Sequence, residues 1–143
     1  PKIITGLPWK GTWYIPGGNS YLAHLISDAG GDYLWQENTS EVSVPLSFEH
    51  VFQKAQSAEI WINSGAANSY AEVLSVDERV SEFPSFKQKK IFNNNAIQNK
   101  NGGNDYWESG IVHPELILSD MLKIFHPDLM PAYTLTYYKP LEN

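Results

Sequence analysis

The stretch AEIWINSGAANSYAE, Ala58–Glu72, decides the fold because it joins a buried strand to a capped helix. The apolar run that ends at Asn63 is typical of a strand inside a parallel sheet covered on both faces. Ser64–Asn68 follows as a predicted tight loop. Ser69 and Glu72 then have the spacing of a capping box, in which both side chains satisfy the first amides of a helix. The stretch therefore predicts one strand–loop–helix unit.

The same alternation extends in both directions along the chain. Further strands are predicted at Lys2–Gly6, Asp32–Trp35 and Ile91–Asn93, and Tyr133–Tyr138 predicts a terminal extended segment. Helices are predicted from Asn19 or Ser20 to Gly30, from a cap at Ser47 onward, from Ser69 to Phe83 with a break near Val76 and Asp77, and from Pro114 to about His126. Alternation of this kind predicts an α/β fold, a three-layer α/β/α Rossmann-like lobe with a largely parallel central sheet.

Aromatic and amide side chains follow the predicted strands. In parallel α/β sheets, ligands bind outside the carboxyl ends of the strands. The segments that leave these ends are Leu7–Gly18, Gln36–Val44, Ser64–Asn68 and Asn94–Trp107, all predicted as loops. The tryptophan-rich and asparagine-rich segments are therefore expected along a single rim of the sheet.

Composition excludes several classes of function. The 143 residues carry a net charge of −6 and no Lys/Arg cluster, which argues against a nucleic-acid partner. Cysteine is absent, so neither a disulfide framework nor a thiolate metal site can form. No apolar run approaches the ~20 residues that span a bilayer, and no signal peptide is visible. The chain opens with Pro1 instead of Met, and we expect it to be a piece of a longer protein.

Motifs for enzymatic chemistry are missing. The sequence contains no G-x-S-x-G elbow, no dinucleotide-binding G-x-G-x-x-G after a strand and no P-loop. The four histidines lack the spacing of a metal site, so any metal is expected to arrive inside its own organic ligand. Gly17–Ser20 opens a helix, and its amides could receive an anion, although a capped turn is the simpler interpretation.

Two aromatic segments are candidate walls of a ligand site. Trp9, Lys10, Trp13 and Tyr14 belong to the first rim segment, and flat rings with a few polar groups suit a large planar or chelating ligand. The alternative is that one or two of these rings only cover the end of the sheet.

The second candidate wall is Asn104–Glu108. Tyr106 and Trp107 could close on the ligand, and Asp105 or Glu108 could accept a hydrogen bond from it. Alternatively, this segment is a first helical turn with Asn104 or Asp105 as its cap. Two amides complete the predicted site from neighbouring rim segments, namely Asn68 and Asn94.

Glu49 and Glu72 lie in the first turns of two predicted helices. A carboxylate is stabilised there by the helix dipole. The functional alternative is an ion pair with an arginine of a membrane partner.

Several segments in their order resemble one family. These are GTWYIPGGNSYLAHLISDAGG (Gly11–Gly31), VPLSFEHVFQKAQSAEIWIN (Val44–Asn63), FPSFKQKKIFNNN (Phe83–Asn95) and NDYWESGIVHPELILSDMLKIFHPDLM (Asn104–Met130). Together they resemble the C-terminal half of periplasmic substrate-binding proteins that deliver iron–siderophores, haem or cobalamin to ABC transporters. The segments around Trp9 and Tyr106 look most like a Bacteroidetes-type branch.

The resemblance implies two α/β lobes joined by one long helix, with the ligand in the cleft between them. This chain would be the C-terminal lobe, with Trp9, Trp13, Tyr14, Tyr106 and Trp107 facing the ligand. An exposed glutamate would dock the lobe to the permease, with Glu72 the better match and Glu49 the reserve.

The implied protein is not an enzyme and needs no cofactor of its own. It would bind an iron(III) chelate of the siderophore type, or a corrinoid, in the periplasm of a Gram-negative bacterium. It would be monomeric and either soluble or lipid-anchored. Two alternatives outside this class stay open, namely a glycan-binding surface module and a small hydrolase or transferase.

Overall fold

The computed structural model describes residues 1–97, 104–107 and 109–143. Its centre is a five-stranded sheet in the order β4-β1-β6-β7-β8. These strands are β1 (Lys2–Thr5), β4 (Asp32–Tyr33), β6 (Ile60–Ile62), β7 (Ile91–Asn93) and β8 (Lys139–Pro140). The first four are parallel, and β8 joins the edge antiparallel to β7. The predicted α/β class with a mostly parallel central sheet is confirmed.

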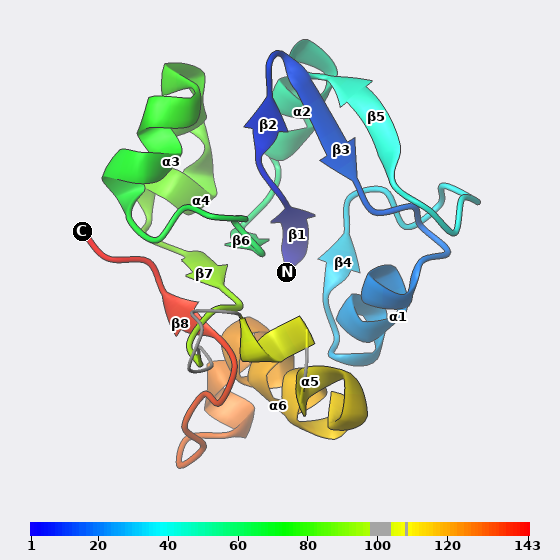
Figure 1. Ribbon diagram of the computed structural model, residues 1–143, viewed down its shortest axis with the longest axis vertical. Helices are drawn as coiled ribbons and strands as arrows, with labels where there is room; N and C mark the ends of the chain where they lie inside the picture. The colour runs from blue at the N-terminus through cyan, green and yellow to red at the C-terminus, as the bar shows by residue number, and fades with distance from the viewer. Residues whose placement is uncertain (98–103, 108) are drawn as a thin grey trace.

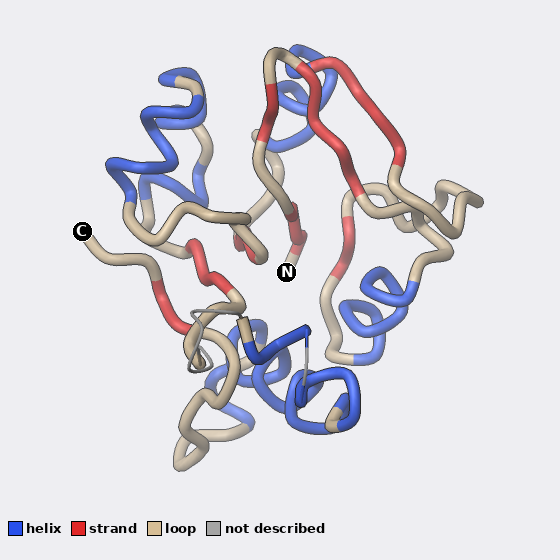
Figure 2. Tube along the Cα trace, in the orientation of Figure 1, coloured by secondary structure: helices blue, strands red, loops and turns tan. Residues whose placement is uncertain are grey.

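Helices cover both faces of this sheet, which crosses the middle of Figure 1 from β8 to β4. One face carries α1 (Tyr21–Asp28) and α6 (Pro114–Phe125). The other carries α2 (Phe48–Ala55), α3 (Tyr70–Val76) and α4 (Pro84–Lys87). Shorter turns are η1 (Glu78–Glu82), η2 (Asp105–Trp107), α5 (Ser109–Val112) and η3 (Pro127–Leu129). Figure 2 shows the helices on the two sides of the strands and the loops that join them.

Serine caps start three of the helices where the sequence predicts them. The hydroxyl of Ser20 accepts from the amide of Ala23, and Ser47 and Ser69 accept from the third amide of α2 and α3 in the same way. The predicted break after Val76 is also present, since α3 ends there and η1 follows. Local hydrogen bonding therefore sets these helix starts.

A second, antiparallel sheet occupies part of Leu7–Gly18, predicted as loop, and the segment just before α2, where a helix start is predicted. It consists of β2 (Pro8–Trp9), β3 (Thr12–Ile15) and β5 (Val44–Ser47). The prediction that Leu7–Gly18 is a loop is wrong because Lys10 and Gly11 both have positive φ, at 48° and 81°. Two such residues form the tight turn that matches the twist of a hairpin.

The terminal segment Tyr133–Tyr138, predicted as extended, pairs with no strand of the sheet. Asp120 of α6 is fully buried, and its carboxylate accepts hydrogen bonds from the amides of Thr136, Tyr137 and Tyr138. These amides are therefore occupied, and strand pairing starts only at β8.

An aromatic cluster joins the small sheet to the central one. Trp13 of β3 has no exposed surface and contacts Trp61, Phe48 and Phe83 at ring-centre distances of 5.5, 6.1 and 6.2 Å. The indole N–H of Trp13 donates to the carbonyl of Thr5, and that of Trp61 donates to Gly6, each at 2.8 Å. The cluster therefore fixes the end of β1. No helix in the described part of the chain is long and apolar enough to cross a membrane.

Candidate functional site

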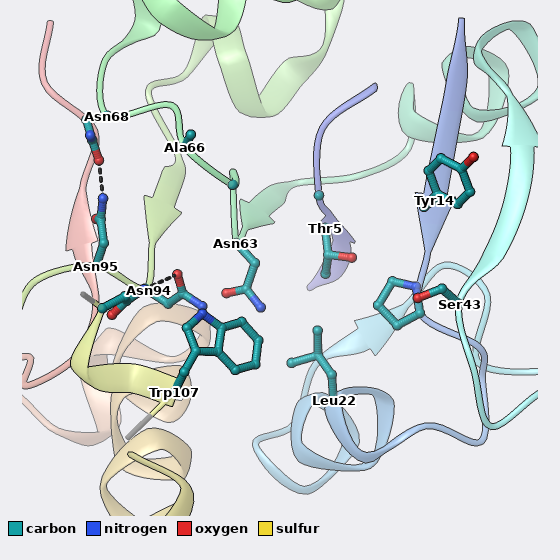
Figure 3. Close-up of a pocket in the computed structure, with 14 residues that line it drawn as sticks. Thr5, Tyr14, Leu22, Ser43, Asn63, Ala66, Asn68, Asn94, Asn95 and Trp107 are labelled. Atoms are coloured by element: carbon teal, nitrogen blue, oxygen red, sulfur yellow. Dashed lines mark hydrogen bonds between the residues drawn. The ribbon is translucent and has the colours of Figure 1, made fainter. Parts of the chain in front are cut away.

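A cavity of about 540 Å³ opens at the carboxyl ends of β1, β6 and β7. Figure 3 shows its lining residues. They come from seven separate segments of the chain and are Thr5, Gly6, Tyr14, Pro16, Leu22, Ser43, Asn63, Gly65, Ala66, Asn68, Asn94, Asn95, Asn104 and Trp107. This is the edge at which parallel sheets hold ligands.

Asn63 forms the middle of the cavity floor, directly after β6. Its φ of 57° is one that asparagine tolerates better than most residues. Its carbonyl accepts from the amide of Gly6 at 3.0 Å, which ties it to the end of β1. Its side-chain oxygen accepts from the hydroxyl of Tyr138 at 2.6 Å. Burial raises the pKa of Tyr138 well above its ordinary value, so this hydroxyl stays a donor at neutral pH.

Amide side chains make up one side of the cavity. The side-chain nitrogen of Asn95 donates to the side-chain oxygen of Asn68. The side-chain nitrogen of Asn104 donates to the side-chain oxygen of Asn94 at 3.3 Å. Behind them, Asn93 donates to the carbonyls of two loop residues, Gly65 and Ala67, at 2.9 and 3.0 Å. These amide pairs hold the loops after β6 and β7 together.

Two exposed aromatic rings stand on opposite sides of the cavity. Figure 3 shows Trp107 beside Asn63 on one side and Tyr14 beside Ser43 on the other, with Leu22 below them. The exposed fractions of Trp107 and Tyr14 are 60% and 54%. Rings this exposed have apolar faces free to pack on a ligand.

A second cavity of about 770 Å³ continues the first. It shares Pro16, Leu22, Ser43, Asn63 and Trp107 with the first cavity, and its other lining residues are Ser20, Tyr21, Glu41, Val42, Tyr106 and Ile117. The two cavities therefore form one groove along the rim, which we call the rim groove.

The structure brings five of the predicted site residues to the rim groove. Tyr14, Asn68, Asn94 and Trp107 line its first cavity, and Tyr106 lines the second. The ring of Tyr106 is mostly buried, with its centre 4.7 Å from that of Trp107, and it supports the exposed indole from behind.

Trp13 does not face the groove, which corrects the prediction for this residue. On β3, neighbouring side chains point to opposite faces, so Tyr14 faces the groove while Trp13 enters the core. Trp9 and Lys10 lie at the tip of the β2–β3 hairpin and are not among the residues that line the groove, so the structure does not support their predicted ligand contact.

Asp105 begins η2, and its side chain lies outside what the structure describes, as does the whole of Glu108. The alternative of a capped turn applies to Asn104, whose side-chain oxygen accepts from the amide of Tyr106 at 3.0 Å. Asn104 therefore both caps η2 and lines the groove.

Sequence reasoning missed several lining residues, above all Asn63, Asn95, Leu22 and Ser43. A signal exists for Asn63, because it is a polar residue that ends the apolar strand β6. Leu22 and Ser43 carry no such signal. The folding of α1 and of the loop before β5 over the rim brings them to the site.

The glycine segment Gly17–Ser20 does not offer its amides to an anion. The amide of Gly17 donates to the carbonyl of Val42, and that of Asn19 donates to Ser40. Ser20 donates to Gly17. Carbonyl oxygens of the 35–42 loop pack so closely on Gly17 and Gly18 that a side chain would not fit. The glycines are therefore needed for packing.

The two candidate docking glutamates differ in their surroundings. The carboxylate of Glu49 lies 3.4 Å from the guanidinium of Arg79, which also binds Asp77 at 2.8 Å. Glu72 accepts only a 3.4 Å hydrogen bond from the hydroxyl of Ser69, and no basic side chain in the described chain pairs with it. Both lie in the first turn of a helix whose start is at the rim side of the sheet.

The histidines lie away from the groove. His24, His113 and His126 have hydrogen-bond partners of their own in Asn19, Glu115 and the carbonyl of Gly30. Within residues 1–97, 104–107 and 109–143, no three His, Cys, Asp or Glu side chains gather closely enough to hold a metal ion.

Comparison with known proteins gives similarity in structure only. No protein-family model and no curated protein sequence matches the chain. A periplasmic solute binding protein of Veillonella parvula matches with a TM-score of 0.65 and 17% identity, over 94% of this chain and 39% of that one. A Staphylococcus epidermidis protein described as a possible iron-binding, periplasmic solute-binding protein has a TM-score of 0.64 and 11% identity, over 87% and 45%.

A third solved structure is an ABC transporter substrate-binding protein of Listeria monocytogenes. Its TM-score is 0.57 and its identity 16%, over 89% of this chain and 48% of that one. The chain therefore spans less than half the length of each of these three proteins and has the fold of one lobe. At such identities the similarity concerns the fold alone.

Proposed function

We propose that this chain is the C-terminal lobe of a substrate-binding protein that serves an ABC importer, and that its rim groove forms half of the ligand site. The proposed ligand is an iron(III) chelate of the siderophore type, and a corrinoid is the alternative within the same class. We further propose that the protein works outside the cytoplasm, as a monomer, by binding without catalysis.

One observation carries this proposal. Aromatic and amide side chains from several segments of the chain line a single groove at the carboxyl ends of parallel strands. Such a groove, mostly apolar with a few oriented polar groups, is the usual form of a small-molecule site. The fold likeness to solute-binding proteins over 94% of the chain supports the same function.

Half a cleft is a poor binding site by itself. The groove is wide and open, and its two exposed rings lie on either side of it. A ligand that rests on it would leave its outer surface in water, so affinity would be low without a second wall. We therefore assign the second wall of the cleft to a second lobe. This chain matches less than half the length of each of the three solved proteins, which leaves room for such a lobe.

We assign permease docking to Glu72, with Glu49 as the reserve. Glu72 has a carboxylate with no cation partner in the described chain, whereas Glu49 already pairs with Arg79. An arginine of the permease could bind Glu72 without first breaking an ion pair.

A glycan-binding module is the second candidate function. Tyr14 and Trp107 are exposed rings with amides between them, and sugars bind to such surfaces through ring stacking and hydrogen bonds. The long groove would suit an oligosaccharide as well as a chelate.

A binding titration on the full-length gene product separates these functions. Tryptophan fluorescence would be followed during addition of ferric siderophores, cyanocobalamin and neutral oligosaccharides. Saturable quenching by a siderophore or by cyanocobalamin supports the proposal. Binding of oligosaccharides alone supports the second candidate, and turnover of a substrate in a parallel enzymatic screen would contradict both.

A further inference from the structure

Among the described residues that line the rim groove, only one side chain is charged. The first cavity is lined by carboxamides, hydroxyls and apolar or aromatic groups. The second adds Glu41, whose carboxylate is the charged group among its described lining residues. The whole chain carries a net charge of −6. A strongly anionic ligand would therefore be repelled by the carboxylate of Glu41 and by the net negative charge of the chain.

Asn95 indicates what kind of group the ligand presents. Its side chain is 8% exposed and lines the first cavity. Its nitrogen donates to Asn68, but its side-chain oxygen is buried and has no partner in the described part of the chain. An unpaired buried acceptor destabilises the protein. That oxygen has less than 1 Å² of exposed surface, so a ligand N–H or O–H group reaches it only if the Asn95 side chain turns towards the cavity.

The neighbouring amides extend the same chemistry. Asn63, Asn68 and Asn94 line the cavity beside Asn95, and the hydroxyl of Ser43 lies across from them. Amides and hydroxyls both donate and accept, so they suit a ligand that does the same. The exposed faces of Trp107 and Tyr14 add flat apolar surface on both sides.

From these observations we infer that the rim groove binds a ligand without net negative charge that presents N–H or O–H groups, such as carboxamides or hydroxyls, between two aromatic walls. This inference rests on the proposed function and narrows its ligand class. Burial of an anionic chelate would need cationic partners to offset lost hydration. An uncharged chelate with peripheral amides can form hydrogen bonds with the groove and needs no cationic partner on this wall.

Calorimetric titration of the full-length gene product with four probes tests the inference. Two probes are uncharged chelates with N–H groups, namely cyanocobalamin and a ferric trihydroxamate on a cyclic peptide. The third is a trianionic ferric tricatecholate, and the fourth is a neutral oligosaccharide. We expect one uncharged chelate to bind at least about 100-fold more tightly than the tricatecholate, a difference of about 2.7 kcal/mol.

Each outcome separates the inference from the proposed function. Equal or tighter binding of the tricatecholate would overturn the inference and leave the proposed function standing. Binding of the oligosaccharide alone would overturn the proposed function and support the neutral, hydrogen-bonding class. Failure of all four probes to bind would contradict both.

Salt dependence provides a second test that needs no variant. An uncharged ligand should bind with an affinity that changes less than about twofold between low and high salt, because there is no ligand charge to screen. In addition, Asn95→Ala should weaken binding about tenfold. A steep salt dependence of the affinity for the best ligand would overturn the inference, even if that variant failed to fold.

Discussion

The hydroxyl of Tyr138 donates a 2.6 Å hydrogen bond to the side-chain oxygen of Asn63, 75 positions earlier in the sequence. This bond ties the segment before β8 to the floor of the rim groove. Asn63 itself follows β6, so one contact couples the terminal segment, the central sheet and the ligand site. Several properties of the protein depend on it.

Removal of this bond should destabilise the protein by a small, measurable amount. Tyr138→Phe deletes the donor and keeps the ring, and we expect the free energy of unfolding in urea to fall by about 1 kcal/mol. An unchanged midpoint of unfolding would show that the bond contributes nothing to the fold.

Substitution of Asn63 separates its backbone role from its side-chain role. Both Asn63→Gly and Asn63→Ala lose the bond to Tyr138, but alanine resists the φ of 57° and glycine does not. The alanine variant should therefore be less stable than the glycine variant by about 1 kcal/mol. Equal unfolding midpoints would contradict a role for the positive φ.

Asp120 should be the most sensitive buried polar residue outside the groove. Its carboxylate accepts from three consecutive backbone amides and from the hydroxyl of Tyr133 at 2.7 Å. Asp120→Ala would leave buried donors without a partner, and we expect a loss of about 3–5 kcal/mol. Asp128→Asn, at an exposed position on η3, is the matched control and should stay within about 0.5 kcal/mol of the wild type.

Alkaline pH should destabilise the fold through buried tyrosines. Burial raises the pKa of Tyr33, Tyr70, Tyr106, Tyr133 and Tyr138. In the unfolded chain these hydroxyls ionise near pH 10, whereas in the folded protein they keep their protons to higher pH. The unfolded state then binds fewer protons, so the free energy of unfolding falls above about pH 10 and is unaffected by these groups below it.

Urea unfolding at a series of alkaline pH values checks this expectation, with a decrease on the order of 1 kcal/mol per pH unit once the unfolded tyrosines ionise. During an alkaline titration, tyrosinate absorbance should rise only above the ordinary pKa of tyrosine and in the same pH range as unfolding. A stability that stays constant through this range would contradict the protected state of these hydroxyls.

The docking role of Glu72 predicts a defect in transport without a defect in binding. Glu72→Gln removes the charge but keeps the capping-box chemistry with Ser69. Uptake by cells that carry the variant should fall about tenfold, while ligand affinity and stability stay near the wild type. Glu49→Gln is the matched control, and a larger transport defect for it would transfer the docking role to that residue.

The layered fold and helix starts could be predicted because their causes are local. Serines at positions 20, 47 and 69 bond to amides three residues away, and apolar runs such as Ile60–Ile62 can only be buried. The small sheet is not predicted, because the glycines and prolines of Leu7–Gly18 are typical of a loop. The alternation from Thr12 to Ile15, with Trp13 and Ile15 inside, is the strand signal in that segment.

The position of the groove could be predicted from the sequence, but the full set of its lining residues could not. Strand ends feed one rim in any parallel sheet, which correctly brings Tyr14 and Trp107 together. Leu22, Ser43 and the unpaired oxygen of Asn95 depend on how loops fold over that rim. Such contacts join residues far apart in sequence, and the periodicity of apolar residues does not predict them.

Two tryptophans of similar exposure provide the most direct test of the rim groove as the ligand site. Trp107 is 60% exposed and lines the groove, whereas Trp9 is 65% exposed and lies at the hairpin tip. In calorimetric titrations of the full-length gene product with its best ligand, Trp107→Ala should weaken binding by at least about tenfold, or 1.4 kcal/mol, and Trp9→Ala by less than about twofold. Equal losses in both variants, or a loss confined to Trp9→Ala, would contradict the assignment of the groove.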